Sequence, residues 1–382
     1  MTAEEKPPAK RESDKPPSPG PEKASQRPAP ASRPEWLVAV LANIKGETDL
    51  PAGSPPDAGA EFDRTETIQS IRDAIQSGGH RTIFIPADSD LPHALEDARP
   101  DICFNIAEGV RGDGREAQVP ALLEMLGIPY TASQVVANAI SLEKTLTKRL
   151  WRDAYLPVTP FQEFISIEDS IRRPGLSYPL FVKPAREGTG MGVDLGAVVK
   201  DEAELRERVA YVLETYRQPA LVETFLPGRE FTVGVLGRRD FPSFSRRPDL
   251  YGPDGFHRFP VLEIESTRSV TPGVYGYKAK SKDMWESGAP GYLCPADIEP
   301  KLVDQLQRLA LRAHRAITAL DVSRVDFRLD AEGNPYLLEI NTLPGLNPEI
   351  SDLCIMSRAE GLLYEHLILE ILDLAAVRFG LL

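Results

Sequence analysis

Short apolar runs alternate with helical segments along the first third of the chain. The runs are WLVAVLANI (36–44), TIFIP (82–86) and DICFNI (101–106), with helix-like segments near 65–76 and between the last two runs. Strand-length apolar runs separated by helices are typical of a parallel sheet covered by helices. The pattern therefore predicts an α/β domain built on a parallel, doubly wound sheet.

The rest of the chain has a mixed pattern. Residues 117–148 read as helical with a break at Gly127, and a helix over 302–320 has apolar residues at helical spacing. An amphipathic helix is expected between the strand-like segments 179–184 and 220–225. Further predicted strands are EFTVGVL (230–236), SRVDFRL (323–329) and PYLLEIN (335–341).

The composition of the 382 residues excludes several classes of protein. Hydrophobic residues make up 42% and charged residues 26%, which are ordinary values for a globular protein. The net charge of -13 argues against a generic electrostatic grip on nucleic acid or on anionic lipid, because both carry the same sign. No apolar stretch reaches the roughly 20 residues of a membrane span. Residues 1–34 hold nine of the 35 prolines and few apolar side chains, so a disordered tail is expected.

Cysteine usage points to a reducing compartment. Cys103, Cys294 and Cys354 are far apart, odd in number and without CxxC spacing. Neither a disulfide framework nor a zinc site is therefore indicated, and a cytoplasmic protein is expected.

The most informative segment is SRVDFRLDAEGNPYLLEINTLPG (323–345), in which two alternating strands flank a turn signal. Folding the hairpin about that turn places Asp326 about opposite Glu339, while the period of two places Glu339 and Asn341 on one face and Arg324 on the side of Asp326. Carboxylate and amide oxygens are hard ligands that suit Mg²⁺. An ordinary solvent-exposed polar face would show the same alternation, so the hairpin alone leaves both interpretations open.

Two further segments could hold a nucleotide. In FVKPAREGTGMGV (181–193) an apolar strand ends in Lys183 and a glycine-rich loop follows, in which small residues let backbone N–H groups wrap phosphate oxygens. This segment is neither a Walker A motif nor a G-x-G-x-x-G fingerprint, and a flexible surface hairpin would look alike. In LVETFLPGREF (221–231) an acidic and apolar mixture could frame a purine, with Glu230 near the sugar hydroxyls, although an ordinary connection between strands would also fit.

The order of these segments resembles the ATP-grasp superfamily, and within it the D-alanine–D-alanine ligase group, from about residue 101 to the C-terminus. The motifs that carry the resemblance are LLEMLGIPYTAS with the SLEK lysine, VKPAREGTGMGV, LVETFLPGREFTVGVLG, YKAK with CPA, and RVDFRLD with YLLEINTLPG. The resemblance implies an α/β fold with an α+β ATP-grasp clasp that holds ATP between a central and a C-terminal domain. It divides the chain into a tail (1–34), an N-terminal domain (35–141), a central subdomain (142–226) and a C-terminal metal-binding domain (227–382).

Carried over residue by residue, the resemblance implies a complete nucleotide and metal site. Two Mg²⁺ ions, for which Mn²⁺ could substitute, would be held by Asp326, Glu339 and Asn341. ATP would be contacted by Lys144, Lys183, Glu187, Gly188, Gly190, Gly192, Glu223, Phe225, Leu226 and Glu230. The implied catalytic residues are Arg324 on the transferring phosphate, Lys280 near the γ-phosphate, Thr189 in the place of a loop serine, and Glu61 for the amine of the first substrate.

The implied activity is ligation of a carboxylate to an amine. The carboxylate would attack the γ-phosphate to give an acyl phosphate, and the amine would then displace phosphate. The expected partners are small-molecule amino acid or carboxylic acid substrates, without nucleic acid or membrane, and a homodimer is also expected. The alternative is a nucleotide-binding protein that lacks ligation and acts as an interaction or regulatory module through its tail. A nicotinamide-dependent oxidoreductase is disfavoured because no G-x-G-x-x-G follows residues 36–44.

The departures from the family pattern fall on the side that recognises amino acids. The first apolar run continues as ANIKGETDLPAG and lacks the family's glycine, serine and glutamate signature. Glu108 precedes Gly109 where the family usually has a histidine before the glycine, and Ser281 and Ser351 mark two further differences. The sequence therefore supports the use of ATP better than it identifies the acid or the amine.

Overall fold

The computed structural model of the chain describes residues 33–265, 274, 276 and 290–382. The predicted tail, apart from its last two residues, and the predicted catalytic Lys280 lie outside the described residues. Among the helices that are described, none is both long enough and apolar enough to cross a bilayer.

Three parallel strands form the N-terminal sheet, in the order β2-β1-β3. Side chains alternate across β1, so that Val38 and Val40 pack toward the first helix while Ala39 and Leu41 pack toward the next two. The predicted parallel sheet with helices on both faces is confirmed. The elements of this part are β1 (Leu37–Ala42), α1 (Thr65–Ser77), β2 (Arg81–Pro86), α2 (Leu91–Ala98), β3 (Ile102–Asn105), α3 (Gln118–Leu126) and α4 (Val135–Leu142).

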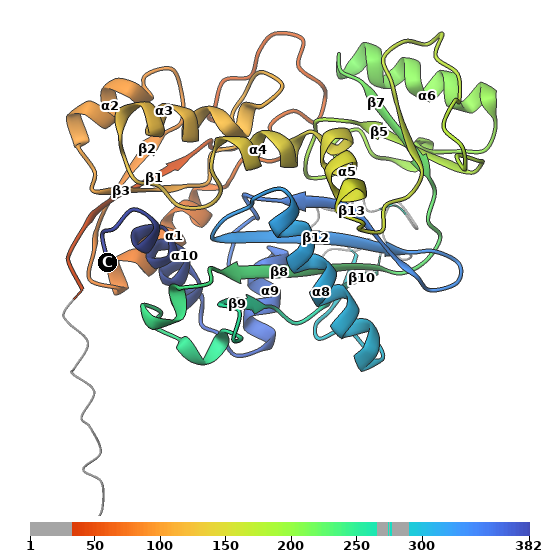
Figure 1. The fold of residues 1–382 in the computed structure, drawn as a ribbon. Helices are drawn as coiled ribbons and strands as arrows, with labels where there is room; N and C mark the ends of the chain where they lie inside the picture. Colours follow the sequence, from red (N-terminus) through yellow and green to blue (C-terminus); the bar gives the residue numbers. More distant parts are fainter. Residues whose placement is uncertain (1–32, 266–273, 275, 277–289) are drawn as a thin grey trace, which may run out of the picture. The chain divides into compact units, whose positions relative to one another are not determined.

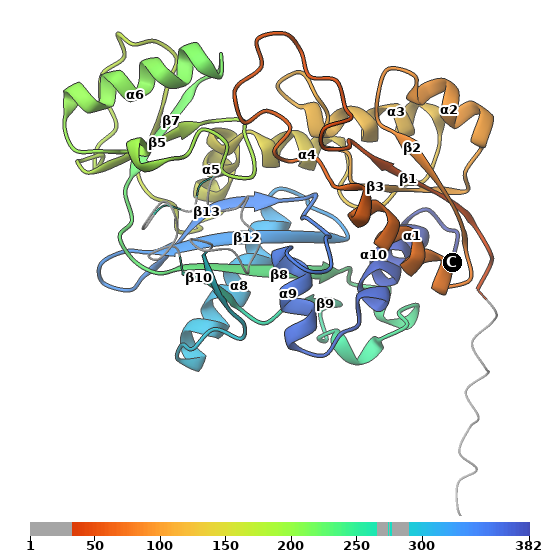
Figure 2. The same cartoon turned by 180° about the vertical axis from the view of Figure 1, so that it is seen from behind.

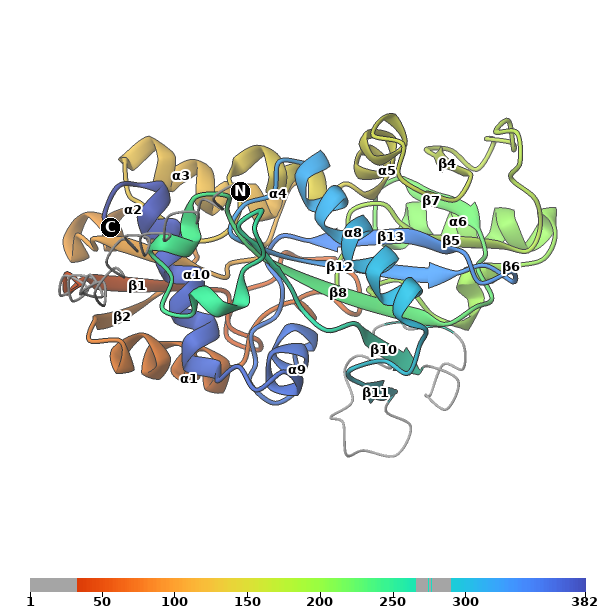
Figure 3. The ribbon, with the colours of Figure 1, turned by 60° about the horizontal axis from the view of Figure 1, so that its bottom comes forward.

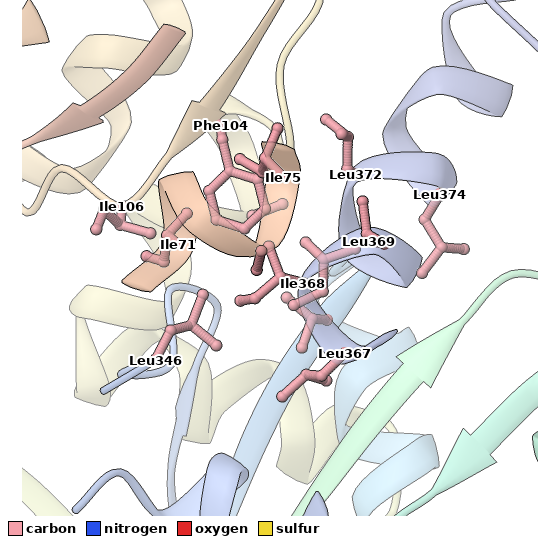
Figure 4. Packing of buried hydrophobic residues seen from close by; sticks show 14 of the residues in the cluster. Ile71, Ile75, Phe104, Ile106, Leu346, Leu367, Ile368, Leu369, Leu372 and Leu374 are labelled. Atoms are coloured by element: carbon pink, nitrogen blue, oxygen red, sulfur yellow. The ribbon is translucent and has the colours of Figure 1, made fainter. Parts of the chain in front are cut away.

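The last helix of the chain, α10 (Tyr364–Arg378), packs against α1 of the N-terminal part. Figure 4 shows Ile71 and Ile75 of α1 and Phe104 of β3 facing Ile368 and Leu372 of α10. These side chains are buried, so the C-terminal helix completes the core beneath the first sheet. The sequence did not indicate which element would cover this face.

The central sheet has four antiparallel strands in the order β4-β7-β5-β6. Helix α6 covers one face of this sheet through Leu205, Val209 and Val212, as its apolar periodicity predicts (Figure 1). Asp201 caps the helix by accepting hydrogen bonds from the backbone N–H groups of residues 203 and 204. The elements are β4 (Phe161–Phe164), β5 (Leu180–Pro184), β6 (Val198–Val199), α6 (Glu202–Thr215) and β7 (Ala220–Thr224).

The largest sheet runs in the order β11-β10-β8-β12-β13, with β9 paired to β8. Helices α5 and α8 cover one face and α9 contacts the other (Figures 2 and 3). The helix predicted over 302–320 ends at Ala316, and Thr318 beyond it has a positive φ of 58°. The elements are α5 (Lys144–Asp153), β8 (Glu230–Gly237), β9 (Phe256–Arg258), β10 (Leu262–Glu265), β11 (Gly291–Leu293), α8 (Pro300–Ala316), β12 (Val322–Leu329), β13 (Pro335–Asn341) and α9 (Asp352–Ala359).

The hairpin of β12 and β13 has the predicted pairing. Asp326 lies opposite Glu339 and Arg324 lies opposite Asn341, with an irregularity in register just after Asp326. The turn is fixed by the side chain of Asp330, which accepts hydrogen bonds from the N–H groups of Glu332 and Asn334. The candidate metal ligands therefore share one end of the largest sheet.

Candidate active site

Two adjoining cavities meet at Lys144 and Glu339, which line both. The Nζ atom of Lys144 lies 3.4 Å from Oε2 of Glu339. Lys144 is the first residue of α5 and Glu339 lies in β13, so this contact joins the central part of the chain to the largest sheet. Apart from these two residues, the two cavities are lined by different sets of side chains.

The smaller cavity, of about 70 Å³, has β5, β7 and the glycine-rich loop on one side and β12 and β13 on the other. Phe181 and Phe225 stack with ring centroids 6.4 Å apart, and the guanidinium of Arg328 lies 5.5 Å from the ring of Phe225. Such flat surfaces suit a purine. The predicted nucleotide residues in its wall are Lys144, Lys183, Glu187, Gly190, Glu223, Phe225, Leu226 and Glu230, and Asp326 and Glu339 adjoin them.

A buried group of charges stands behind this cavity. The carboxylate of Glu223 lies 2.9 Å from Nζ of Lys148 and 3.0 Å from Nζ of Lys183, and it accepts a hydrogen bond from the hydroxyl of Thr159. Burial by itself raises the pKa of Glu223, but the two ammonium groups outweigh it and lower the pKa to about 2. Sequence reasoning missed Lys148, although its place four residues after Lys144 puts both on one face of α5.

The hairpin end of the site offers oxygen ligands for a metal. Asp326 accepts two hydrogen bonds from Arg324, of 3.0 and 2.9 Å, and one of 2.6 Å from the hydroxyl of Thr232. A carboxylate has about four acceptor positions, so Asp326 can still meet a cation. The Nδ2 atom of Asn341 is buried without a hydrogen bond to any described residue, so that amide is not committed elsewhere. Two carboxylates and an amide fit Mg²⁺.

Arg324 is positioned by acidic side chains of two elements. Besides Asp326, its guanidinium contacts Asp352 of α9 at 3.1 Å. Arg324 and Asn341 both line the larger cavity, of about 220 Å³, and so do Thr189 and Gly188 of the glycine-rich loop. Arg324, predicted to act on the transferring phosphate, therefore borders the larger cavity rather than the smaller one.

The glycine-rich loop is fastened to the N-terminal part of the chain. Glu61 accepts the N–H of Gly188 at 2.6 Å and a hydrogen bond from Arg115 at 2.8 Å, and Arg115 also contacts Glu187 at 3.0 Å. A Cβ atom at position 188 would lie 2.2 Å from Oε1 of Glu61, so the carboxylate would have to move to admit any other residue there. Gly192, another predicted nucleotide contact, donates its N–H to Asp57. Glu61 lines the larger cavity, but its carboxylate oxygens accept hydrogen bonds from Gly188 and Arg115.

Three more carboxylates line the larger cavity, and sequence reasoning assigned none of them a role: Asp63, Glu108 and Glu116. They are called the carboxylate cluster below. Burial raises the pKa of Asp63 to about 7 and, with a smaller contribution from Glu61, that of Glu116 to about 8. Burial, followed by the charges of Glu116 and Glu61, also raises the pKa of Glu108. Asp63 lies just before α1, whereas Glu108 and Glu116 lie in the connection between β3 and α3, so no single sequence motif marks the three.

The raised pKa values predict how stability depends on pH. Carboxyl groups in an unfolded chain titrate near pH 4, so the folded protein binds extra protons between about pH 4 and pH 8 and loses stability as pH rises through this window. Glu116→Gln removes one titrating group, so thermal melting without ligands should depend less steeply on pH between about pH 5 and pH 8. Identical slopes for the variant and the natural protein would contradict the assignment.

Comparison with known proteins reveals extensive similarity. A family model described as the D-ala D-ala ligase C-terminus matches residues 150–373. The D-alanine–D-alanine ligase of Sphingopyxis alaskensis is 31% identical over 90% of this chain and 98% of its own, and that of Chelativorans sp. is 32% identical over 73% and 82%. An uncharacterized protein of Sinorhizobium fredii is 34% identical over 81% and 87%. A D-alanine–D-alanine ligase structure from Bacillus anthracis, complexed with ATP, superimposes with a TM-score of 0.65 at 18% identity, covering 90% of this chain and 99% of that one.

Proposed function

This chain belongs to the D-alanine–D-alanine ligase family and is an ATP-dependent carboxylate–amine ligase, and we propose that its two adjoining cavities divide ATP from the amino-acid substrates. One observation carries this proposal: Lys144 and Glu339 line both cavities. A triphosphate that extends from the smaller cavity would reach the larger one at these two residues. There a substrate carboxylate can meet the terminal phosphate.

In this proposal the chain's own residues hold the phosphates and exclude water. Lys183 and Lys144 supply positive charge, and the loop of residues 187–192 lies over the smaller cavity, where it keeps water from the acyl phosphate. Arg324, fixed by Asp326 and Asp352, faces the larger cavity and can stabilise the charge that develops on the transferring phosphate. Asp326, Glu339 and Asn341 would hold Mg²⁺, which when bound neutralises phosphate charge.

We also propose that the site binds two Mg²⁺ ions and that amino acids, as small-molecule substrates, serve as both acid and amine. We further propose that the protein is a cytoplasmic homodimer. Its chain would be divided into the tail, the N-terminal domain, the central subdomain and the C-terminal metal-binding domain. All three cysteines are free in the structure, which suits a reducing compartment. The formal charge of -13 supports small-molecule partners over nucleic acid.

The test is phosphate release from ATP and Mg²⁺ in the presence of single and paired D- and L-amino acids. We expect release that requires a particular pair and yields a dipeptide together with ADP. Tight ATP binding without release for any pair would instead favour a nucleotide-binding protein that has lost ligation.

A further inference from the structure

The carboxylate cluster is fixed in place by the backbone at the end of β1. Asn43, the residue after β1, accepts the N–H of Asp63 through its backbone carbonyl and the N–H of Gly109 through its side chain. Its own amide donates to Ala87, so Asn43 is locked by three hydrogen bonds. Asp63 and the loop that carries Glu108 are therefore held at one rigid point.

Gly109 allows the loop that carries Glu108 to approach the turn that carries Glu116, the third member of the cluster. Gly109 has a φ of +75°, and a Cβ atom there would lie 2.5 Å from the backbone oxygen of Arg115. The loop that carries Glu108 thus packs directly on the turn that carries Glu116. The side chain of Glu116 is 9% exposed and still lines the larger cavity.

No member of the cluster makes a side-chain hydrogen bond or an ion pair with any residue that the structure describes. The nearby guanidinium of Arg115 is engaged by Glu61, Glu187 and the backbone carbonyl of residue 186. Lys45 and Arg64 also line the cavity, but from exposed positions. Glu116 is buried, and Asp63 and Glu108 are half-buried. Carboxylates withdrawn from water are normally paired, so three without such a partner beside one cavity indicate a ligand that supplies positive charge.

The charge that fits is an organic cation. No group of three or more His, Cys, Asp or Glu residues in the described part of the chain is arranged to hold a metal ion. An ammonium group has three N–H donors and no acceptor, and so can bond to several carboxylates at once. Lys144, Arg324 and Asn341 line the same cavity, and the reacting end of the substrate would lie beside them.

We propose that the carboxylate cluster binds a second positively charged group of the amino-acid substrate, so that the ligase uses an amino acid with a basic side chain. This inference rests on the proposed function, because it takes the larger cavity as the amino-acid site. The basic side chain would extend to Glu108 and Glu116, with Asp63 beside them. The α-carboxylate would then face Arg324 and Lys144.

The experiment compares charged and uncharged substrates of the same shape. D- and L-lysine, ornithine, norleucine and alanine are titrated calorimetrically into the full chain with Mg²⁺ and a non-hydrolysable ATP analogue. At least one basic amino acid should bind about tenfold or more tightly than norleucine, as expected for a charge-assisted hydrogen bond. Glu116→Gln and Glu108→Gln should each remove most of this preference, and Glu214→Gln on the exposed face of α6 should keep it.

The variants should remain folded, because each removes one of several like charges that are buried together; melting curves check this. Two results would overturn the subsite. One is that no basic amino acid, neither lysine nor ornithine, binds more tightly than norleucine; the other is an unchanged preference in the double variant Glu108→Gln with Glu116→Gln. Phosphate release is measured separately. Phosphate release that occurs only with neutral amino acids would overturn the subsite but support ligase activity. A binding preference for basic amino acids, without phosphate release from any pair, would support the subsite but refute ligase activity.

Discussion

Glu339→Gln is expected to lower phosphate release from ATP by roughly 100-fold or more, the scale on which single electrostatic groups act in catalysis. Glu339 is opposite Asp326 in the hairpin and 3.4 Å from Lys144, where the two cavities meet. The substitution keeps the shape of the side chain but removes the negative charge that would hold Mg²⁺ and balance Lys144. The loss should therefore appear mainly in kcat, and raising Mg²⁺ should recover part of it.

The matched control is Glu332→Gln, which makes the same chemical change at an exposed position in the turn of the same hairpin. Its turnover should equal that of the natural protein, and both variants should melt at similar temperatures. Full turnover in Glu339→Gln would contradict the assignment of Glu339 as a ligand of Mg²⁺. Among the described residues, only Glu339 and Lys144 line both cavities.

Glu223→Gln is expected to destabilise the fold by about 3–5 kcal/mol, the usual cost of removing one partner from a buried ion pair. Lys148 is fully buried and Lys183 is 7% exposed, and both depend on the carboxylate of Glu223. A neutral glutamine would deprive both buried ammonium groups of the carboxylate with which they form ion pairs. Urea unfolding measures the loss.

A double variant separates repulsion between the lysines from a simple loss of packing. Lys148→Met alone leaves Glu223 paired with Lys183 and should cost less than Glu223→Gln. Adding Lys148→Met to Glu223→Gln removes one of the two uncompensated charges, so it should restore part of the stability. A double variant as unstable as the sum of the two single variants would show that the charges are not coupled.

The sequence predicted those parts of the site that lie on regular elements. The pairing of Asp326 with Glu339 follows from a period of two on either side of a turn, and the structure confirms it. The parallel first sheet is likewise confirmed, because its strands are short apolar runs between helices. The contribution of α10 could not be predicted, since an amphipathic helix does not specify which of several apolar faces it covers.

The residues that sequence reasoning missed depend on tertiary contacts. Lys148 looks like one more charge on a helix until the fold places Glu223 beside it. Asp63 meets the β3–α3 connection, which carries Glu108 and Glu116, because Asn43 hydrogen-bonds to both segments at the end of β1. Within that connection, Gly109 allows the close approach to Arg115. The environment of Glu61 was also unpredictable, because its partner Arg115 lies 54 residues away in sequence.

The most direct test of the account is a crystal structure of the chain with Mg²⁺ and a non-hydrolysable ATP analogue. We expect adenine beside Phe225, with the triphosphate passing Lys183 so that its last phosphate lies between Lys144 and a cation held by Asp326 and Glu339. A nucleotide bound elsewhere, or one whose phosphates point away from Glu339, would contradict it.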